Sequence, residues 1–220
     1  MAIILCLETA TTNCSVALCE DANVIALKED NSKGYSHAEK LHVFIDEILK
    51  ENDLKIDNLD AVAISKGPGS YTGLRIGVSA AKGLCFAQDI PLISIPTLTA
   101  IAKQVTPKKG EQVIPMLDAR RMEVYSAVFD SAFNQIRDTR AEVLSEESFQ
   151  EELAKGKVHF IGNGVAKFRE ICEHPNAEFI EDRLPSAKEM STIAYDKYKI
   201  SDIEDVAYFE PYYLKDFVAG

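Results

Sequence analysis

Two acidic residues stand where a carboxylate could serve catalysis. Glu8 follows an apolar segment at the start of the chain, and Asp118 follows a similar segment near its middle. Carboxylates at the ends of buried strands can bind a metal ion or hold a catalytic proton. These acids are the strongest enzymatic signal in the sequence, although neither has a second ligand at a metal-site spacing.

The stretch around Gly67 and Gly69 could hold a phosphate. The two glycines let the chain turn sharply after a strand, Pro68 fixes one dihedral angle, and Ser70 or Thr72 can cap the following helix. Amides at a helix N-terminus attract anions, but the Gly-Lys-Ser/Thr ending of a Walker A loop is missing. The residues of this possible phosphate or cleft site are Glu8, Thr9, Thr11, Gly67, Gly69 and Asp118.

Other catalytic arrangements are missing from the sequence. His37 and His42 are five residues apart on one predicted helix, which separates them by about 140° around its axis, too far to bind one metal ion easily. The other two histidines have no metal-ligand spacing, and Ser15 and Ser70 lack the G-x-S-x-G elbow. No two cysteines have the C-x-x-C spacing, so we expect buried, reduced thiols. We expect no catalytic residue and no metal ligand.

Charge and composition limit the partners. The 220 residues include 24 basic and 35 acidic ones, for a formal net charge of -11, with no Lys/Arg-rich run. Such a surface repels phosphate backbones, so the chain alone should bind RNA poorly and needs another protein to reach it. The apolar start lacks a basic flank and is too short for a signal peptide or a membrane span. We therefore expect a cytoplasmic protein without membrane contact.

Apolar periodicity and turn signals predict alternating strands and helices. The elements expected in the first half are strands at 2–8, 14–20, 24–28, 61–65 and 91–95 and helices at 37–50 and 73–87. Ser36 and Glu39 have the form of a capping box at the start of the first helix.

The second half repeats this order. Asp118 is equivalent to Glu8 at the end of an apolar strand, and the strand that follows each acid is similar in both halves. We expect an α/β protein with two lobes, residues 1–105 and 106–220, joined by the polar, turn-rich linker 106–110.

Small residues recur along the helix predicted at 73–87. Gly73, Gly77, Ala81 and Cys85 are spaced four apart and form one stripe, although a glycine inside a helix costs about 1 kcal/mol relative to alanine. Such a stripe lets another surface approach closely. The pattern leaves two interpretations open, which are packing on the protein's own sheet and a helix–helix interface with another subunit.

The segment from Lys66 to Leu84 resembles the TsaB (YeaZ) family. It matches the family pattern G-P-G-S-F/Y-T-G-L-R-I-G-x-x-x-A-K-G-L almost letter for letter. Glu8 is a departure, because the family usually has Asp in the opening strand. Further matches cover nearly the whole chain: Leu7–Thr11, Leu117–Arg120, Glu123–Tyr125, Gly162–Gly164, Pro185–Ala187 and Glu210–Lys215.

The resemblance implies a two-lobed actin-like ATPase (ribonuclease H-like) fold, each lobe a mixed sheet with flanking helices. It implies a non-catalytic, activating scaffold subunit of the complex that transfers a threonylcarbamoyl group to the adenosine beside the tRNA anticodon. The implied partners are the transferase TsaD, the ATPase TsaE and, without TsaD, a second copy in a homodimer. We expect tRNA contact only through this complex, and no cofactor here, because ATP and metal belong to the partner subunits.

In the catalytic relatives two histidines spaced H-x-x-x-H hold the metal, and the matching positions here are Thr97 and Ile101. The resemblance also implies that the two predicted helices of the first lobe contact TsaD. The expected interface residues are Leu41, Phe44, Ile45, Ile48, Leu74, Gly77, Val78, Ala81 and Cys85. We therefore expect Gly77→Arg or Ala81→Trp to abolish pairing without unfolding the chain. The alternative is an independent enzyme of the same fold, either an ATP-dependent kinase or a glycoprotease-like peptidase.

Overall fold

The computed structural model describes residues 1–32 and 36–215, and these form two compact units. The units are residues 1–100 with the described chain from Pro185 onward, and Ile101–Leu184. Each has its own sheet and its own hydrophobic core.

The division between the units differs from the predicted lobes 1–105 and 106–220. The chain enters the second unit within helix α3 (Thr97–Ala102) and not at the polar linker 106–110. It then returns to the first unit at Pro185. The predicted second lobe is therefore corrected, since its last part packs on the first sheet.

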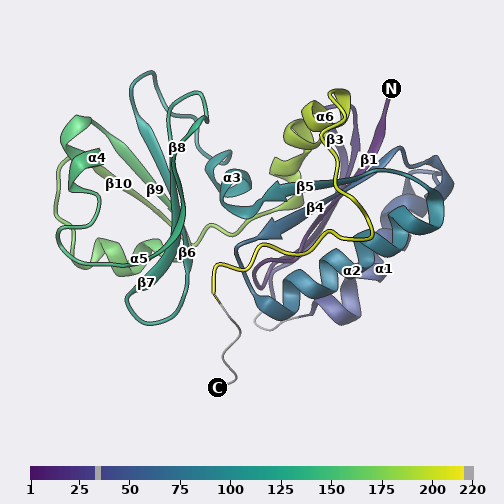
Figure 1. Cartoon of the computed structure of the whole chain (residues 1–220), viewed down its shortest axis with the longest axis horizontal. Helices are drawn as coiled ribbons and strands as arrows, with labels where there is room; N and C mark the ends of the chain where they lie inside the picture. The colour runs from purple at the N-terminus through teal and green to yellow at the C-terminus, as the bar shows by residue number, and fades with distance from the viewer. Residues whose placement is uncertain (33–35, 216–220) are drawn as a thin grey trace. The chain divides into compact units, whose positions relative to one another are not determined.

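The first unit is built on a five-stranded mixed sheet with the strand order β3-β2-β1-β4-β5 (Figure 1). Its strands are β1 (Ile3–Glu8), β2 (Cys14–Glu20), β3 (Asn23–Asp30), β4 (Ala61–Gly67) and β5 (Leu92–Pro96). Strands β1, β2 and β3 form an antiparallel meander, whereas β4 and β5 continue the sheet parallel to β1. The central strand β1 is buried along its whole length, as expected for a strand with both faces covered.

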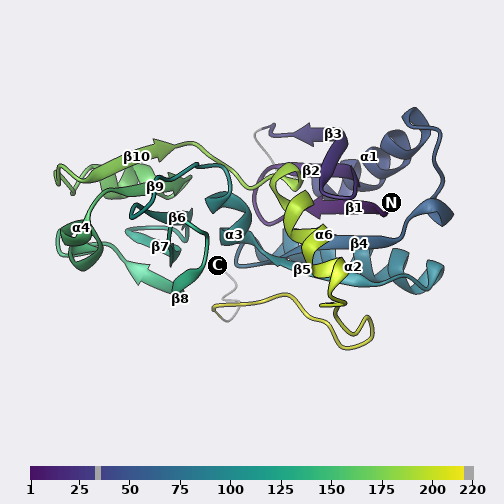
Figure 2. The ribbon, with the colours of Figure 1, turned by 90° about the horizontal axis from the view of Figure 1, so that it is seen from above.

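Helices cover both faces of this sheet (Figures 1 and 2). They are α1 (His37–Glu51), η1 (Ile56–Asn58), α2 (Tyr71–Gln88), η2 (Ala187–Met190) and α6 (Ser191–Lys199). Successive residues of β1 alternate between two cores. Leu5 and Leu7 belong to the core under α1 and α2, whereas Ile4 and Cys6 belong to the core under η2 and α6.

The second unit repeats the topology of the first, with the strand order β10-β9-β6-β7-β8. Its elements are β6 (Gln112–Asp118), β7 (Glu123–Phe129), β8 (Gln135–Val143), α4 (Gln150–Lys155), β9 (Val158–Gly162), α5 (Val165–Arg169) and β10 (Ala177–Glu181). Strand β6 pairs antiparallel with β7 and parallel with β9, as β1 does with β2 and β4. The repeat predicted from Glu8 and Asp118 is confirmed, because each acid ends the equivalent strand.

The predicted serine cap is present at α2 but not at α1. The amide of Gly73 donates to Ser70 Oγ (3.3 Å) at the start of α2. At α1, Ser36 Oγ instead donates to Oδ2 of Asp30 (2.7 Å) and accepts no bond from a helix amide, so the predicted capping box with Glu39 is wrong. Within the described chain, no helix has the length and apolar character needed to cross a membrane.

Candidate functional site: the outer face of α1 and α2

Most residues predicted for a partner interface face the protein's own core. Phe44 is half-buried against that core, and Gly77 is buried. The others are no more than 4% exposed, and they are Leu41, Ile45, Ile48, Leu74, Val78, Ala81 and Cys85. The predicted interface is therefore corrected, because the helical faces that carry these residues are covered by the protein's own sheet.

Close packing on the sheet explains the small residues of α2. A Cβ atom at Gly77 would overlap Oγ1 of Thr9 and lie 2.9 Å from Cδ1 of Ile64. A Cβ atom at Gly73 would overlap the carbonyl oxygen of Thr9. Helix α2 thus approaches the turn after β1 more closely than alanine would permit. Of the two interpretations of the stripe, packing on the protein's own sheet is the one that the structure supports.

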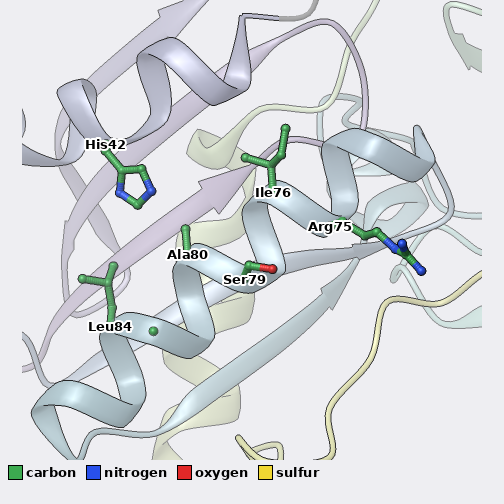
Figure 3. Close-up of a pocket in the computed structure, with 7 residues that line it drawn as sticks. His42, Arg75, Ile76, Ser79, Ala80 and Leu84 are labelled. Carbon is green, nitrogen blue, oxygen red and sulfur yellow. The ribbon is translucent and has the colours of Figure 1, made fainter.

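A groove remains open between the outer sides of α1 and α2. Its volume is about 540 Å³, and it is lined by His42, Arg75, Ile76, Ser79, Ala80, Gly83 and Leu84. Figure 3 shows His42 on α1 facing Ala80 and Leu84 of α2 across this groove. Exposed apolar side chains occur on the same two helices, since Val43 is 48% exposed and Phe86 is 85% exposed. A hollowed apolar face of this kind is typical of a protein–protein contact.

The C-terminal segment borders the other side of α2 (Figure 1). Nζ of Lys82 donates to the carbonyl oxygens of Ala207 (3.1 Å) and Phe209 (2.9 Å), and the amide of Tyr212 donates to the carbonyl of Lys66 (2.7 Å). A second hollow of about 220 Å³ lies between this segment and α2. The exposed side of α2 is therefore flanked by α1 on one side and by residues 207–213 on the other.

The two turns that could hold a phosphate in the first unit are closed against each other. The amide of Ser70 donates to the carbonyl of Ala10 (2.7 Å), and a Cβ atom at Gly69 would overlap that same carbonyl. A Cβ atom at Gly67 would lie 2.6 Å from the carbonyl oxygen of Tyr212. Glycines that bring backbone against a phosphate in other proteins here bring backbone against backbone.

Glu8 lies beneath these turns and is fully buried. Burial raises the pKa of Glu8 to about 7, although the amide of Ala10 donates to its Oε1 (2.6 Å) and favours the charged form. Thr9 and Thr11 from the same turn are also buried. The structure thus brings Glu8, Thr9, Thr11 and the two loop glycines together, but as a closely packed cluster in which Gly69 is partly exposed and the others are buried.

Asp118, the equivalent acid of the second unit, has a different environment. Its side chain is 44% exposed, and its Oδ1 atom accepts from Nζ of Lys167 (2.5 Å) and from the amide of Arg120 (2.6 Å). The carboxylate therefore holds together the turn after β6 and the helix α5.

The two buried histidines, His37 and His159, are engaged in local contacts. Nε2 of His37 contacts the carbonyl oxygen of Thr11 (2.7 Å), and Nε2 of His159 contacts Oε2 of Glu111 (2.7 Å). Among the residues that the structure describes, no group of three or more His, Cys, Asp or Glu is arranged to hold a metal ion. All five cysteines are buried and free, which confirms the expectation of buried thiols.

The residues that line the open groove were not among those predicted from the sequence. A signal was present, because Ile76, Leu84 and Phe86 are apolar residues of α2 that lie off the small-residue stripe. Apolar residues that remain after one buried helical face has been assigned indicate a second contact surface.

Comparison with known proteins places the chain in a family. The family profile described as tRNA N6-adenosine threonylcarbamoyltransferase (TsaD) matches residues 31–219. The tRNA threonylcarbamoyladenosine biosynthesis protein TsaB of Haemophilus influenzae is 31% identical over 98% of this chain and 94% of its own length. The TsaB protein of Escherichia coli is also 31% identical, over 98% of this chain and 96% of its own length.

Solved structures agree with this assignment. YeaZ from Pseudomonas aeruginosa superposes with a TM-score of 0.82 at 25% identity, covering 97% of this chain and all of that one. The likeness supports the two-lobed actin-like fold, with two five-stranded mixed sheets of the same order. The chain belongs to the TsaB (YeaZ) family of proteins that take part in the threonylcarbamoyladenosine modification of tRNA.

Proposed function

We propose that this chain is a non-catalytic subunit that activates a TsaD-type transferase by docking to it through the outer face of α1 and α2. The observation that carries the proposal is the open apolar groove between these helices, together with the exposed side chains of Val43 and Phe86. Burial of such a face against a partner supplies the free energy of association.

The kinship of the two subunits supports the choice of partner. A TsaD-type transferase of Bacillus thuringiensis is 36% identical over 108 residues, or 42% of this chain. The TsaD-type family profile matches residues 31–219, which include α1 and α2, so a transferase of this family is expected to carry an equivalent helix pair. Two related helix pairs can pack face to face, and the same geometry allows a homodimer when the transferase is missing.

The closed state of the first unit supports a non-catalytic role. Glu8 is fully buried, and the glycine loop is filled by the turn after β1 and by the C-terminal segment. Thr97 and Ile101, which stand at the positions of the metal-binding histidines, are both buried. Thr97 forms a hydroxyl–hydroxyl hydrogen bond with Ser65 (2.7 Å). On this proposal ATP and the metal ion bind the partner subunits, TsaE joins the pair, and tRNA is held through the complex.

The experiment is a reconstitution with TsaD and TsaE from the same genome. Gly83→Arg tests the groove, because a Cβ atom at Gly83 meets no atom of the described residues within 4 Å, and the monomer should therefore stay folded. We expect co-purification with TsaD to be lost and modification of tRNA to fall with it. Blocking the centre of an interface commonly costs about 2 kcal/mol or more, which is roughly a thirtyfold loss of affinity.

The matched control is Ile200→Arg. Ile200 is 74% exposed and follows α6, on the other face of the sheet from α1 and α2 (Figure 1). This variant should pair and activate like the wild type. If Gly83→Arg pairs as well as Ile200→Arg does, the groove is not the docking face. Saturable Mg-ATP binding by the isolated chain in calorimetry would favour the independent enzyme instead.

A further inference from the structure

Arg75 is held in a fixed position on the exposed side of α2. Its Nε donates to the hydroxyl of Tyr213 (3.2 Å), and its guanidinium carbon lies 4.2 Å from the ring centroid of Tyr71. The two tyrosine rings are themselves 4.9 Å apart. A cation over an aromatic face and one directed hydrogen bond restrict a side chain that would otherwise lose much rotamer freedom on binding.

Arg75 has an acidic neighbour in Glu210, which lines the same hollow beside α2. The pKa of Arg75 is raised first by its hydrogen bond to Tyr213 and also by the negative charge of Glu210. A guanidinium has five N–H donors, and one of them is used by the Tyr213 hydroxyl. No ion pair joins Arg75 to an acidic side chain within residues 1–32 and 36–215. By contrast, Lys82 on the same helix directs its ammonium group to two carbonyl oxygens. The outer fork of Arg75 thus remains available for a planar anion.

The position of Arg75 is central on the proposed docking face. It lines both the groove against α1 and the hollow against the C-terminal segment, as does Ser79. Figure 3 shows its side chain extending away from His42, toward the side of α2 that this segment covers. An arginine at the centre of a contact surface is desolvated on docking, and such residues often dominate the affinity.

We infer that Arg75 forms a fork-type ion pair with a carboxylate of the docked TsaD-type partner, and that Tyr71 and Tyr213 position it for this contact. The inference rests on the proposed function. A guanidinium fork matches a carboxylate in two parallel hydrogen bonds, and a side chain already held in place loses little entropy when it binds. The C-terminal segment thereby becomes part of the docking site, since it supplies Tyr213.

A transferase fits this site better than a second copy. In a two-fold homodimer both copies bring the same arginine to the shared face, and two guanidinium groups repel each other near the axis. A related but different subunit is free to present an acid at that place. The free energy of association then favours the heterodimer, because the heterodimer gains an ion pair whereas the homodimer brings two like charges together.

The test is a titration of the chain with TsaD in the absence of tRNA. Arg75→Ala removes the charge, Arg75→Lys keeps it without the fork, and Tyr213→Phe removes only the hydroxyl that positions it. We expect the affinity to fall roughly thirtyfold or more in Arg75→Ala, about tenfold in Arg75→Lys and a few-fold in Tyr213→Phe. The thermal unfolding of the free chain should be unchanged in all three. The salt dependence of binding should weaken in Arg75→Ala and persist in Tyr213→Phe.

The outcomes separate this inference from the proposed function. If the wild type binds TsaD, Gly83→Arg does not, and Arg75→Ala binds within twofold of the wild type, the ion pair is wrong and the docking face stands. If the wild type fails to bind, the proposed function itself fails. If Arg75→Ala weakens the homodimer and not the heterodimer, the assignment of the partner is overturned. Restored binding of Arg75→Glu to a TsaD variant with an acid replaced by lysine would support the pair directly.

Discussion

Gly77 of α2 lies directly against Thr9 in the turn after β1, so that a Cβ atom at Gly77 would overlap Oγ1 of Thr9. Gly77→Ala should therefore force the helix away from the sheet and destabilise the chain by about 1–3 kcal/mol. In the part of the chain that the structure describes, no atom lies within 4 Å of the Cβ position of Gly83 on the same helix. Gly83→Ala should instead stabilise by about 0.5–1 kcal/mol through helix propensity alone. Urea unfolding of both variants measures the difference, and equal effects would contradict this packing.

The same contact reverses an expectation drawn from the sequence. Gly77→Arg and Ala81→Trp are predicted there to leave the chain folded, but Ala81 is fully buried and Gly77 has no space for a side chain. Given this packing, the first unit should be unfolded in both variants. Loss of the circular dichroism signal or aggregation on expression is the expected result, and a native spectrum for either variant would show that the core adapts.

Glu8 makes stability depend on pH. Its pKa is about 7 in the folded chain and near 4.5 when unfolded, so the folded state holds a proton that the unfolded state loses. The stability that this proton provides is present below the unfolded pKa, declines as the pH rises between the two values, and is lost above the folded one. The shift corresponds to about 3 kcal/mol as an order of magnitude.

Glu8→Gln tests this by keeping a neutral side chain of similar size. Unfolding free energies measured from pH 4 to pH 8.5 should fall less steeply in the variant than in the wild type. Only the difference between the two curves matters, because every other titrating group is common to both. Parallel curves would mean that Glu8 is charged in the folded chain.

The strands and the internal repeat follow from local patterns, whereas the failures all involve contacts between distant residues. Ser36 and Glu39 satisfy the spacing of a capping box, but Asp30 at the end of β3 takes the serine hydroxyl. A stripe of small residues looks the same whether it packs on a sheet or on another protein, so the pattern did not reveal which side of α2 was free. The amide of Tyr212 donates to the carbonyl of Lys66 although most of the chain separates the two residues in the sequence, and no local pattern predicts this contact.

The core of the second unit depends on a cluster of phenylalanines. The ring of Phe168 lies 5.3 Å from that of Phe149, 4.9 Å from that of Phe160 and 6.1 Å from that of Phe179. Because Phe168 comes from the five-residue helix α5, these contacts must hold the helix in place. Phe168→Ala should cost about 3–5 kcal/mol in the unfolding of this unit.

Hydrogen exchange can locate that loss. Amides of β9 and β10 should lose protection in Phe168→Ala, whereas amides of β1 and β4 should keep theirs if the two units unfold independently. Phe86→Ala serves as the control, since Phe86 is 85% exposed and its removal should change stability little. A uniform loss of protection across both sheets would show that the two units unfold together.

Lys82 fixes the C-terminal segment that supplies Tyr213 to the proposed docking face. Its ammonium group donates to the carbonyl of Ala207 at an exposed site and to the carbonyl of Phe209 at a partly buried one. A hydrogen bond from a charged donor contributes about 1.5–3 kcal/mol when it is protected from water, and exposure reduces that contribution here. Lys82→Met keeps the aliphatic stem but removes both bonds, so the segment should open more often. Chymotrypsin should then cut faster after Tyr208, which is 84% exposed, because a protease needs a locally unfolded stretch on both sides of the bond. Lys50→Met is the control, since Lys50 pairs with the exposed Asp46 on α1, away from the C-terminal segment. Equal cleavage rates in the two variants would mean that residues 207–213 are held without Lys82, and faster cleavage in Lys82→Met should be accompanied by weaker binding of TsaD.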